Sequence, residues 1–96
     1  MQWSITGEIV IWRGPAPFYF LAIDSGTSDD IKDAARGLEY WGQVAVTARI
    51  GATGFVTALF PKDGRYLLPV KAEVRDAEGI EAGDVRTAEV ALRLDR

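Results

Sequence analysis

Two cations in the second half of the chain have the spacing of an anion clamp. Lys71 and Arg75 lie four residues apart, and residues four apart project from the same face of a helix. An ammonium and a guanidinium on one face can bind a carboxylate or a phosphate through charge-assisted hydrogen bonds. The alternative is that both cations pair with surface acids such as Glu78, which contributes little free energy in solvent. The spacing gives a candidate site for an anionic ligand.

Aromatic residues supply the second part of this candidate site. Five positions carry large rings that could line a pocket: Trp3, Trp12, Tyr40, Trp41 and Tyr66. Aromatic walls with a few polar groups are typical of ligand pockets, although in a small barrel such rings are more often core. Tyr40 and Trp41 fall in an expected loop, so one of the two is expected at a concave mouth or a protein contact. We predict a ligand-binding site formed by Trp41, Tyr66, Lys71 and Arg75.

The residue types that are missing exclude most familiar catalytic chemistry. The 96-residue chain contains no Cys and no His, which excludes thiolate nucleophiles, imidazole bases, disulfides and zinc sites of the usual ligands. No phosphate-binding glycine loop or nucleophile elbow is present. An enzymatic hypothesis still open is that Lys71 acts as a base or nucleophile, which requires a desolvated amine. The composition favours a non-catalytic protein that uses no cofactor or metal.

The charge balance disfavours nucleic acid and membranes as partners. Fourteen Asp and Glu against eleven Lys and Arg give a formal charge of −3, so the overall field repels phosphate backbones and anionic lipids. The N-terminal segment lacks the basic start of a signal peptide, and no stretch reaches the ~20 apolar residues that span a bilayer. We expect a cytoplasmic monomer or weak dimer whose partner is a small anionic ligand or a protein.

The hydrophobic pattern predicts six strands. They are expected at residues 2–12, 18–23, 42–50, 55–60, 66–70 and 85–94. Most of these segments alternate apolar and polar positions, but residues 18–23 are apolar on both faces, as in a central strand covered on two sides. Residues 61–64 have the chemistry of a tight hairpin turn. The parity of apolar positions changes between Val85 and Val90, which predicts a bulge or a strand covered on both faces.

Two short helices are predicted between these strands. Ser28 is expected to cap the first helix and Gly37 to end it, with an apolar stripe packed on the sheet: Ile31, Ala34, Ala35 and Leu38. Three acids in and after its first turn are interpreted as helix-terminus and solvated charges instead of cation ligands: Asp29, Asp30 and Asp33. The second helix is expected to run from Val70 to a glycine cap at Gly79, with Ile80 folding back over its end.

The order of elements predicts an internal duplication. Strand, strand, helix and strand occur twice, and an offset of 47 residues places Thr6 and Gly7 on Thr53 and Gly54. Five residues around 25–29 must then be an insertion. We therefore expect one domain over residues 1–96, with halves of about 1–50 and 51–96. The predicted fold is mainly β: a six-stranded, pseudo-symmetric double-split barrel capped by two short helices.

Several segments, in this order and spacing, resemble the bacterial family DUF1905: Trp41-Gly42, Leu59-Phe60-Pro61, Tyr66-Leu67-Leu68-Pro69-Val70-Lys71, Val74-Arg75 and Gly83-Asp84. The resemblance covers nearly the whole chain. It implies a split β-barrel similar in shape to the swapped-hairpin domains of AbrB-type regulators and MazE-type antitoxins. The family is uncharacterised, so the resemblance implies no catalytic residues. Its members are often joined to a YdeI/OmpD-associated domain, which we expect this chain to lack.

The resemblance also gives an alternative function, that of an AbrB-like DNA-binding regulator. From residue 52 onward, however, the sequence contains seven positively charged residues and eight negatively charged ones. Duplex binding needs several uncompensated cations on one face, and the sequence does not visibly provide them. The prediction therefore favours a binding module for a small anionic ligand or a partner protein.

Overall fold

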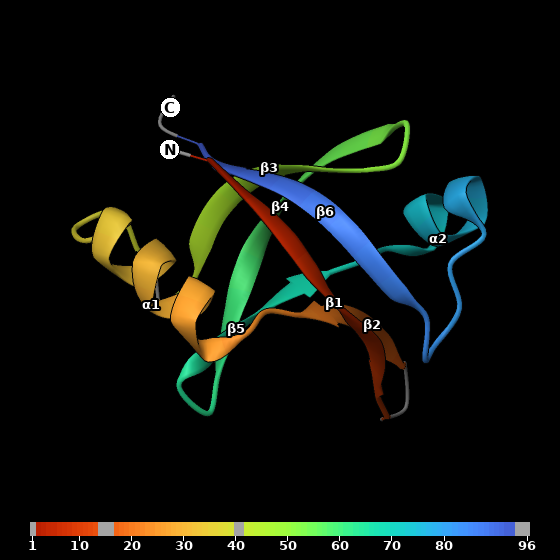
Figure 1. Cartoon of the computed structure of the whole chain (residues 1–96), viewed down its shortest axis with the longest axis horizontal. Coiled ribbons are helices and arrows are strands. Elements are labelled where there is room, and N and C mark those ends of the chain that lie inside the picture. The colour runs from red at the N-terminus through yellow and green to blue at the C-terminus, as the bar shows by residue number, and fades with distance from the viewer. Residues whose placement is uncertain (1, 14–16, 40–41, 94–96) are drawn as a thin grey trace.

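The computed structural model describes residues 2–13, 17–39 and 42–93 and contains a closed antiparallel barrel (Figure 1). The elements follow one another as β1 (Gln2–Trp12), β2 (Phe18–Ala22), α1 (Ser25–Ala34), β3 (Val44–Ile50), β4 (Thr53–Lys62), β5 (Arg65–Pro69), α2 (Ala72–Glu78) and β6 (Val85–Leu92). Around the barrel the strands are arranged in the order β1-β2-β5-β4-β3-β6. The predicted mainly β barrel of six strands and two helices is confirmed.

Strands β1 and β4 each belong to two sheets. The first part of β1 pairs with β6, from Gln2 opposite Ala91 to Glu8 opposite Val85, and its last part pairs with β2. In the same way β4 pairs first with β3 and then with β5. The barrel therefore consists of a β3–β6 sheet and a β2–β5 sheet that share β1 and β4.

Gly7 lies where β1 leaves β6 and approaches β2. A Cβ atom on Gly7 would overlap the carbonyl oxygen of Ala22 and lie 3.0 Å from a methyl carbon of Leu21. Only a residue without a side chain allows two backbones to come this close. The sequence therefore permits the crossing of β1 between the two sheets at this position.

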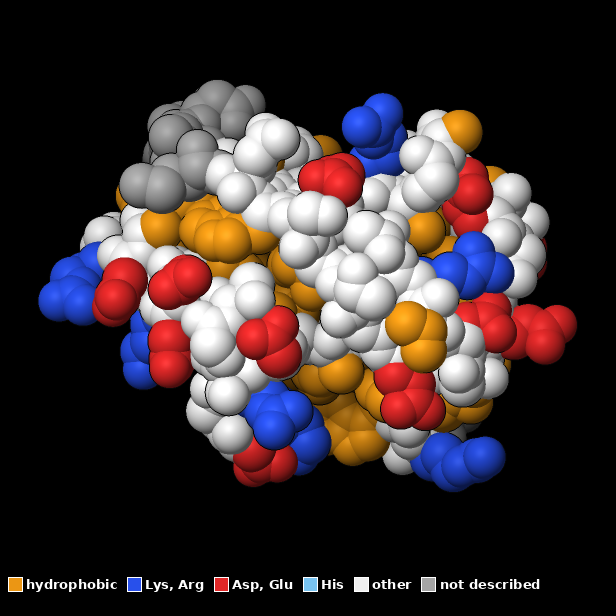
Figure 2. Space-filling view, in the orientation of Figure 1, with side chains coloured by type: hydrophobic (Ala, Val, Ile, Leu, Met, Phe, Trp, Pro, Cys, Tyr) orange, Lys and Arg blue, Asp and Glu red, His pale blue; other side chains and the backbone are white. Residues whose placement is uncertain are grey.

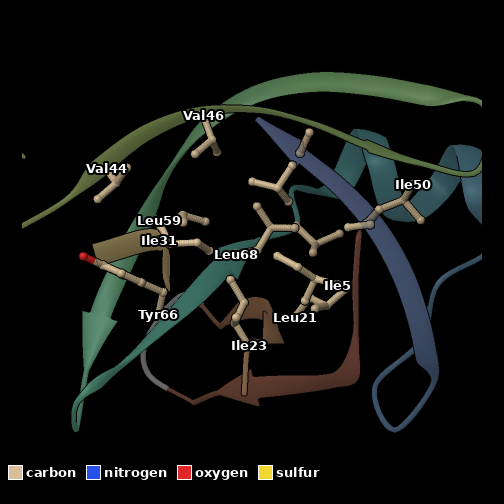
Figure 3. Packing of buried hydrophobic residues seen from close by; sticks show 14 of the residues in the cluster. Ile5, Leu21, Ile23, Ile31, Val44, Val46, Ile50, Leu59, Tyr66 and Leu68 are labelled. Carbon is tan, nitrogen blue, oxygen red and sulfur yellow. The ribbon is translucent and has the colours of Figure 1, made fainter. Parts of the chain in front are cut away.

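The barrel interior is filled by aliphatic side chains from all six strands (Figure 3). Strand β3 shows the reason most simply, since its residues alternate strictly between buried and exposed. The helices lie at opposite ends of the barrel (Figure 1) and complete the core with Ile31 from α1, Ala35 just after it and Val74 from α2. Within the described residues, neither helix has the length and apolarity that crossing a membrane would need.

Helix α1 begins earlier than predicted, and Ser28 is not its cap. The Asp24 carboxylate accepts a hydrogen bond from the Thr27 amide at 3.0 Å and caps the helix, which starts at Ser25. Ser28 is instead buried inside the helix, where its hydroxyl donates to the Ile23 carbonyl and accepts from the Tyr66 amide. Asp29 and Asp30 consequently lie beyond the first turn.

The end of α1 also differs from the prediction. The helix ends at Ala34, and Gly37 turns the chain away with a φ of 85°. Leu38, which was expected in the apolar stripe, is exposed because it follows this turn. The stripe that packs on the barrel is therefore shorter than the pattern indicated.

Strand β6 contains no bulge over residues 85–91. Its register with β1 is continuous over these residues. The change of apolar parity arises because Val85 points outward and is exposed, whereas Ala88 and Val90 point into the core. The strand is thus half-buried, and the predicted bulge or double coverage is wrong. Position 94, the predicted end of the strand, lies outside the described residues.

Two glycine turns of the second half are confirmed. Asp63 and Gly64 have φ values of 53° and 80° and connect β4 to β5, as in a two-residue hairpin with both central residues in the left-handed region. Gly79 ends α2 with a φ of 62°, and the Ile80 amide donates to the Arg75 carbonyl at 3.0 Å. This is the predicted glycine cap.

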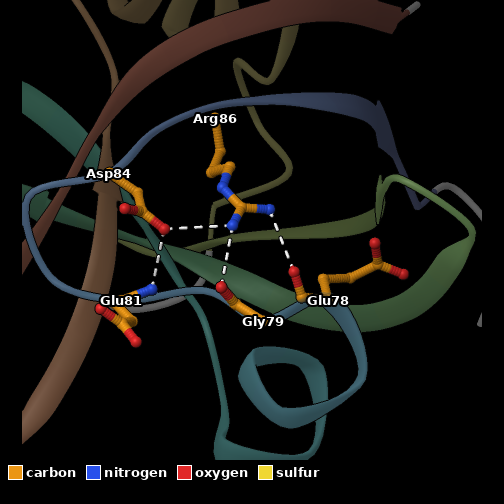
Figure 4. Close-up of polar contacts among 5 residues, drawn as sticks. All are labelled: Glu78, Gly79, Glu81, Asp84 and Arg86. Carbon is orange, nitrogen blue, oxygen red and sulfur yellow. Dashed lines mark hydrogen bonds and ion pairs between the residues drawn. The ribbon is translucent and has the colours of Figure 1, made fainter.

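Arg86 connects the end of α2 to the start of β6 (Figure 4). Its guanidinium donates to the carbonyls of Glu78 and Gly79 at 3.2 and 2.9 Å and pairs with Asp84 at 3.1 Å. The backbone hydrogen bond from Glu81, followed by the hydrogen bond and charge of Arg86, lowers the pKa of Asp84 below its ordinary value of 3.8. A charged Asp84 therefore stabilises the folded turn.

We predict that Gly7→Ala destabilises the barrel, because the new methyl group collides with the Ala22 carbonyl. Overpacking of this kind costs about 2 kcal/mol, measured as the free energy of unfolding in urea. Gly54→Ala is the matched control, since the nearest atom to its Cβ is 3.9 Å away. Equal losses in the two variants would contradict the close-approach argument.

We predict that the stability difference between the wild type and Asp84→Asn depends on pH. The folded state lowers the pKa of Asp84, so the carboxylate stabilises the fold above its unfolded pKa and ceases to do so as pH falls through its folded pKa. Thermal unfolding should show the variant as less stable at pH 7, with the gap closing below pH 3.8. A gap that is constant from pH 7 to pH 2 would contradict the role of the charge.

Candidate functional site

Four aromatic rings from three strands form a cluster on the outer surface of the β2–β5 sheet. We call this cluster the aromatic face; it consists of Trp12, Phe18, Phe20 and Phe60. The Trp12 ring centroid lies 5.8 Å from that of Phe20 and 5.5 Å from that of Phe60. Phe18 extends the cluster, 6.4 Å from Phe20. These separations are typical of favourable aromatic contacts.

Strand register explains why the rings point outward. Ile9 and Leu21 are paired across β1 and β2 and both point into the core. Side chains alternate along a strand, so every second pair points the other way. The pairs of Val10 with Phe20 and of Trp12 with Phe18 therefore face away from the core. The pairing of Phe60 with Leu67 places the fourth ring beside them.

The aromatic face is only partly protected from solvent. Phe20 is 6% exposed, although it is not part of the core cluster, because its neighbours in the aromatic face cover it. Trp12 and Phe18 remain 42% and 61% exposed, so the described part of the chain covers these two rings only in part. The prediction that residues 18–23 are covered on two sides therefore holds at Phe20 and is wrong at Phe18.

The outer surface of the β3–β6 sheet is different and conventional. There the cross-strand neighbours are polar: Ser4 hydrogen-bonds Glu89 at 3.0 Å, and Thr6 hydrogen-bonds Thr87 at 2.8 Å. One barrel thus carries polar pairs and the isolated exposed residues Val56 and Val85 on one sheet, and a cluster of aromatic rings on the other. Because large exposed apolar patches are unusual on soluble domains and often indicate a binding surface, the aromatic face is the best candidate site.

Two hollows flank the rings of Trp12 and Phe20, which line both. The first, about 420 Å³, is lined by all four rings and Pro69, with Gln43 and Lys71 among its polar groups. The second, about 450 Å³, contains Lys62, Asp63 and Arg65. We call them the Lys71 hollow and the Lys62 hollow.

The cations of the two hollows outnumber the acids. Among the described residues that line them are three cations and one carboxylate, Asp63, giving a local formal charge of +2 in a chain of net charge −3. The Lys62 ammonium lies 5.1 Å from the centroid of the Trp12 ring and 3.6 Å from the Asp63 carboxylate. On the view of the molecule in Figure 2, by contrast, Lys and Arg side chains lie among Asp and Glu side chains.

Of the four residues predicted to form the ligand site, the three that the structure describes lie in different surroundings. Trp41 lies outside the described residues. Lys71 lines the hollow named after it, but Tyr66 lines a separate cavity of about 240 Å³ beside α1, together with Lys32 and Glu39. The structure therefore brings Lys71 to the aromatic face and Tyr66 to the opposite side of β5.

Tyr66 is largely a core residue. Its side chain is almost fully buried, and its hydroxyl points away from the aliphatic cluster (Figure 3). Burial, and secondarily the charge of Glu39, raises the pKa of Tyr66 above its ordinary value of 10.0. Its ring therefore stays neutral and serves the packing of β5 against α1.

Arg75 contacts the strand β2 instead of sharing a face with Lys71. Its guanidinium carbon lies 3.7 Å from the centroid of the Tyr19 ring, and it donates to the Val70 carbonyl at 2.7 Å. Lys71 is the residue before the helix and has extended backbone angles. Because helical spacing applies only within a helix, the two side chains diverge.

The acids of α1 form no cation site. No group of three His, Cys, Asp or Glu side chains in the described ranges is arranged to hold a metal ion. Asp33 instead forms an exposed ion pair with Arg36 at 3.0 Å. Asp33 is thus a solvated charge, whereas the predicted helix-terminus role of Asp29 and Asp30 is wrong because α1 has no acid in its first turn.

We predict that Arg75→Ala destabilises the protein by about 1–2 kcal/mol, because it removes a stacked guanidinium and a hydrogen bond to a backbone carbonyl. Urea unfolding would measure the loss. Arg75→Lys keeps the charge but not the flat guanidinium, so it should restore only part of the stability. Full restoration by Lys would contradict the stacking role.

Comparison with known proteins gives a family but no activity. The curated proteins contain no match to this chain. The family model DUF1905, described as a domain of unknown function, matches residues 6–90. The match extends over both sheets and both helices. It includes all four rings of the aromatic face. The chain therefore belongs to the DUF1905 family.

Proposed function

We propose that the chain is a non-catalytic binding module whose site is the aromatic face. The ligand has a flat apolar body, which lies in the Lys71 hollow, and an anionic group, which pairs with the Lys71 ammonium. The observation that carries this proposal is the combination of exposed rings and a cation around one hollow. Its volume of about 420 Å³ is within the range of small-molecule sites.

The free energy gained by covering the exposed rings supports a ligand at this face. Trp12 and Phe18 leave much of their surface in water, so covering them releases free energy of roughly 25 cal/mol for each Å² of apolar surface. A ligand without charge would gain only this contribution. An anion gains in addition a charge-assisted contact with Lys71, which lines the hollow.

The predicted duplication belongs to this proposal as the origin of the two-sheet barrel. Exchanging β1, β2 and β3 with β4, β5 and β6 leaves every neighbour relation around the barrel unchanged. Helices α1 and α2 also occupy equivalent places, since each lies between the second and third strands of its half. Both relations support a pseudo-twofold, double-split barrel in which the aromatic face has developed on the sheet that pairs β2 with β5.

We predict that Lys71→Ala weakens binding of 2-naphthoate, a flat apolar anion, about tenfold without unfolding the protein. Loss of one charge-assisted hydrogen bond accounts for that factor. Chemical-shift titration of the labelled protein gives the dissociation constant, and the resonances of Trp12 and Phe18 should show the largest shifts. Lys32→Ala is the matched control, since Lys32 is exposed on α1, at the other end of the barrel from α2 (Figure 1).

A second ligand separates the apolar and ionic contributions. 2-Naphthalenemethanol has the same ring system without the charge, so it should bind the wild type and Lys71→Ala equally. If 2-naphthoate shifts no resonance of the aromatic face, the proposed function is wrong. If it binds Lys71→Ala as tightly as wild type, the assignment of the anion to Lys71 is wrong.

A further inference from the structure

The two hollows have the same two features, an aromatic wall and a cation, and a single small ligand fills only one of them. Trp12 and Phe20 line both, so the hollows are neighbours along one surface. Each hollow has an aromatic wall and its own cation: Lys71 in one, and Lys62 with Arg65 in the other. The arrangement fits a ligand that contains at least two flat units joined by anionic links.

The topology of the barrel decides between two polymers of that kind. An extended peptide binds sheets best by adding a strand at an open edge, but the described strands form a closed ring. A peptide could lie on the aromatic face without adding a strand, but its backbone carries no charge to match the cations of the two hollows. A nucleobase stacks through its flat face and keeps its polar edges in water, so exposed rings suit it.

We propose that the aromatic face binds a short single-stranded nucleic acid. Consecutive bases lie against the two exposed rings, Trp12 and Phe18, and occupy the two hollows. The phosphates lie near Lys62, Arg65 and Lys71. Phe20 and Phe60 support the exposed rings from below through their ring contacts. This inference rests on the proposed function, because it uses the same site and names its ligand class.

Double-stranded DNA is a poor ligand for the same face. Its bases are paired and stacked inside the helix, so they cannot reach Trp12 or Phe18. The remaining attraction is that of the phosphates, which the chain's charge of −3 opposes at long range. The inference therefore agrees with the unfavourable charge balance for duplex binding and differs from an AbrB-like function.

Local charge limits the affinity for a single strand. Three cations line the hollows, and each phosphate contact with a single strand contributes about −0.7 to the slope of log affinity against log salt concentration. A slope of roughly −2 is therefore expected, with weak binding that depends on stacking as much as on charge.

The test is fluorescence anisotropy of 5′-fluorescein-labelled (dT)8 and rU8 with the wild type in 20 to 200 mM NaCl. Phe18→Ala should weaken binding about tenfold, since stacking on one ring is lost. Lys62→Ala should reduce the magnitude of the salt slope by about 0.7. Val85→Ala and Lys32→Ala are the matched controls, because they remove an exposed apolar residue and an exposed cation outside the two hollows.

Three competitors sharpen the result. Unlabelled (dT)8 should displace the probe, whereas an octamer of glutamate and an annealed 8-base-pair duplex should not. Binding that persists unchanged in Phe18→Ala, or displacement by the glutamate octamer, would overturn the inference because either shows that charge alone attracts the strand. If 2-naphthoate binds but neither oligonucleotide does at 20 mM NaCl, this inference fails and the proposed function stands.

Discussion

The close approach of β1 to β2 at Gly7 is the constraint on which the barrel depends. Because no side chain separates the two backbones there, β1 can leave β6 and continue along β2 without a break. The same strand therefore closes the barrel and carries Trp12 to a position opposite Phe18. A side chain at Gly7 would push β1 away from β2 and disturb the core pair of Ile9 and Leu21. Closure and the candidate site thus have a common structural origin.

The contrast between the two sheets shows what folding does and does not require. The β3–β6 sheet folds with polar pairs such as Thr6 and Thr87 on its outer surface. The β2–β5 sheet has the same antiparallel pairing and fills the same core, so stability alone does not explain rings at Trp12 and Phe18. Exposed rings favour association in water, and a ligand that covers them would account for their presence. The proposed function follows from this difference between two otherwise similar sheets.

Much of the fold could be predicted from the sequence, because alternation in β3 and the turn residues Asp63 and Gly64 are local signals. The predictions were wrong where a competing residue or a contact distant in sequence determines the local structure. Asp24 caps the helix in place of Ser28, because its carboxylate lies four residues earlier and accepts a hydrogen bond from the Thr27 amide. For the site, aromatic residues on both faces of 18–23 look the same whether the outer face is covered or open. In the fold the helices lie at the ends of the barrel, and the exposure of Trp12 and Phe18 shows that this face is partly open.

Charge gives the clearest case of information that the order of residues does not contain. The formal charge of −3 describes the field far from the protein. Salt screens this field over a distance of about 10 Å, so its effect on a distant ligand is small. A bound ligand instead meets the few groups beside it, and the fold places Lys71 in one hollow and Lys62 and Arg65 in the next. Helical spacing linked Lys71 to Arg75, but Lys71 precedes the helix and Arg75 stacks on Tyr19. The cation is therefore available to a ligand because the helix begins one residue after it.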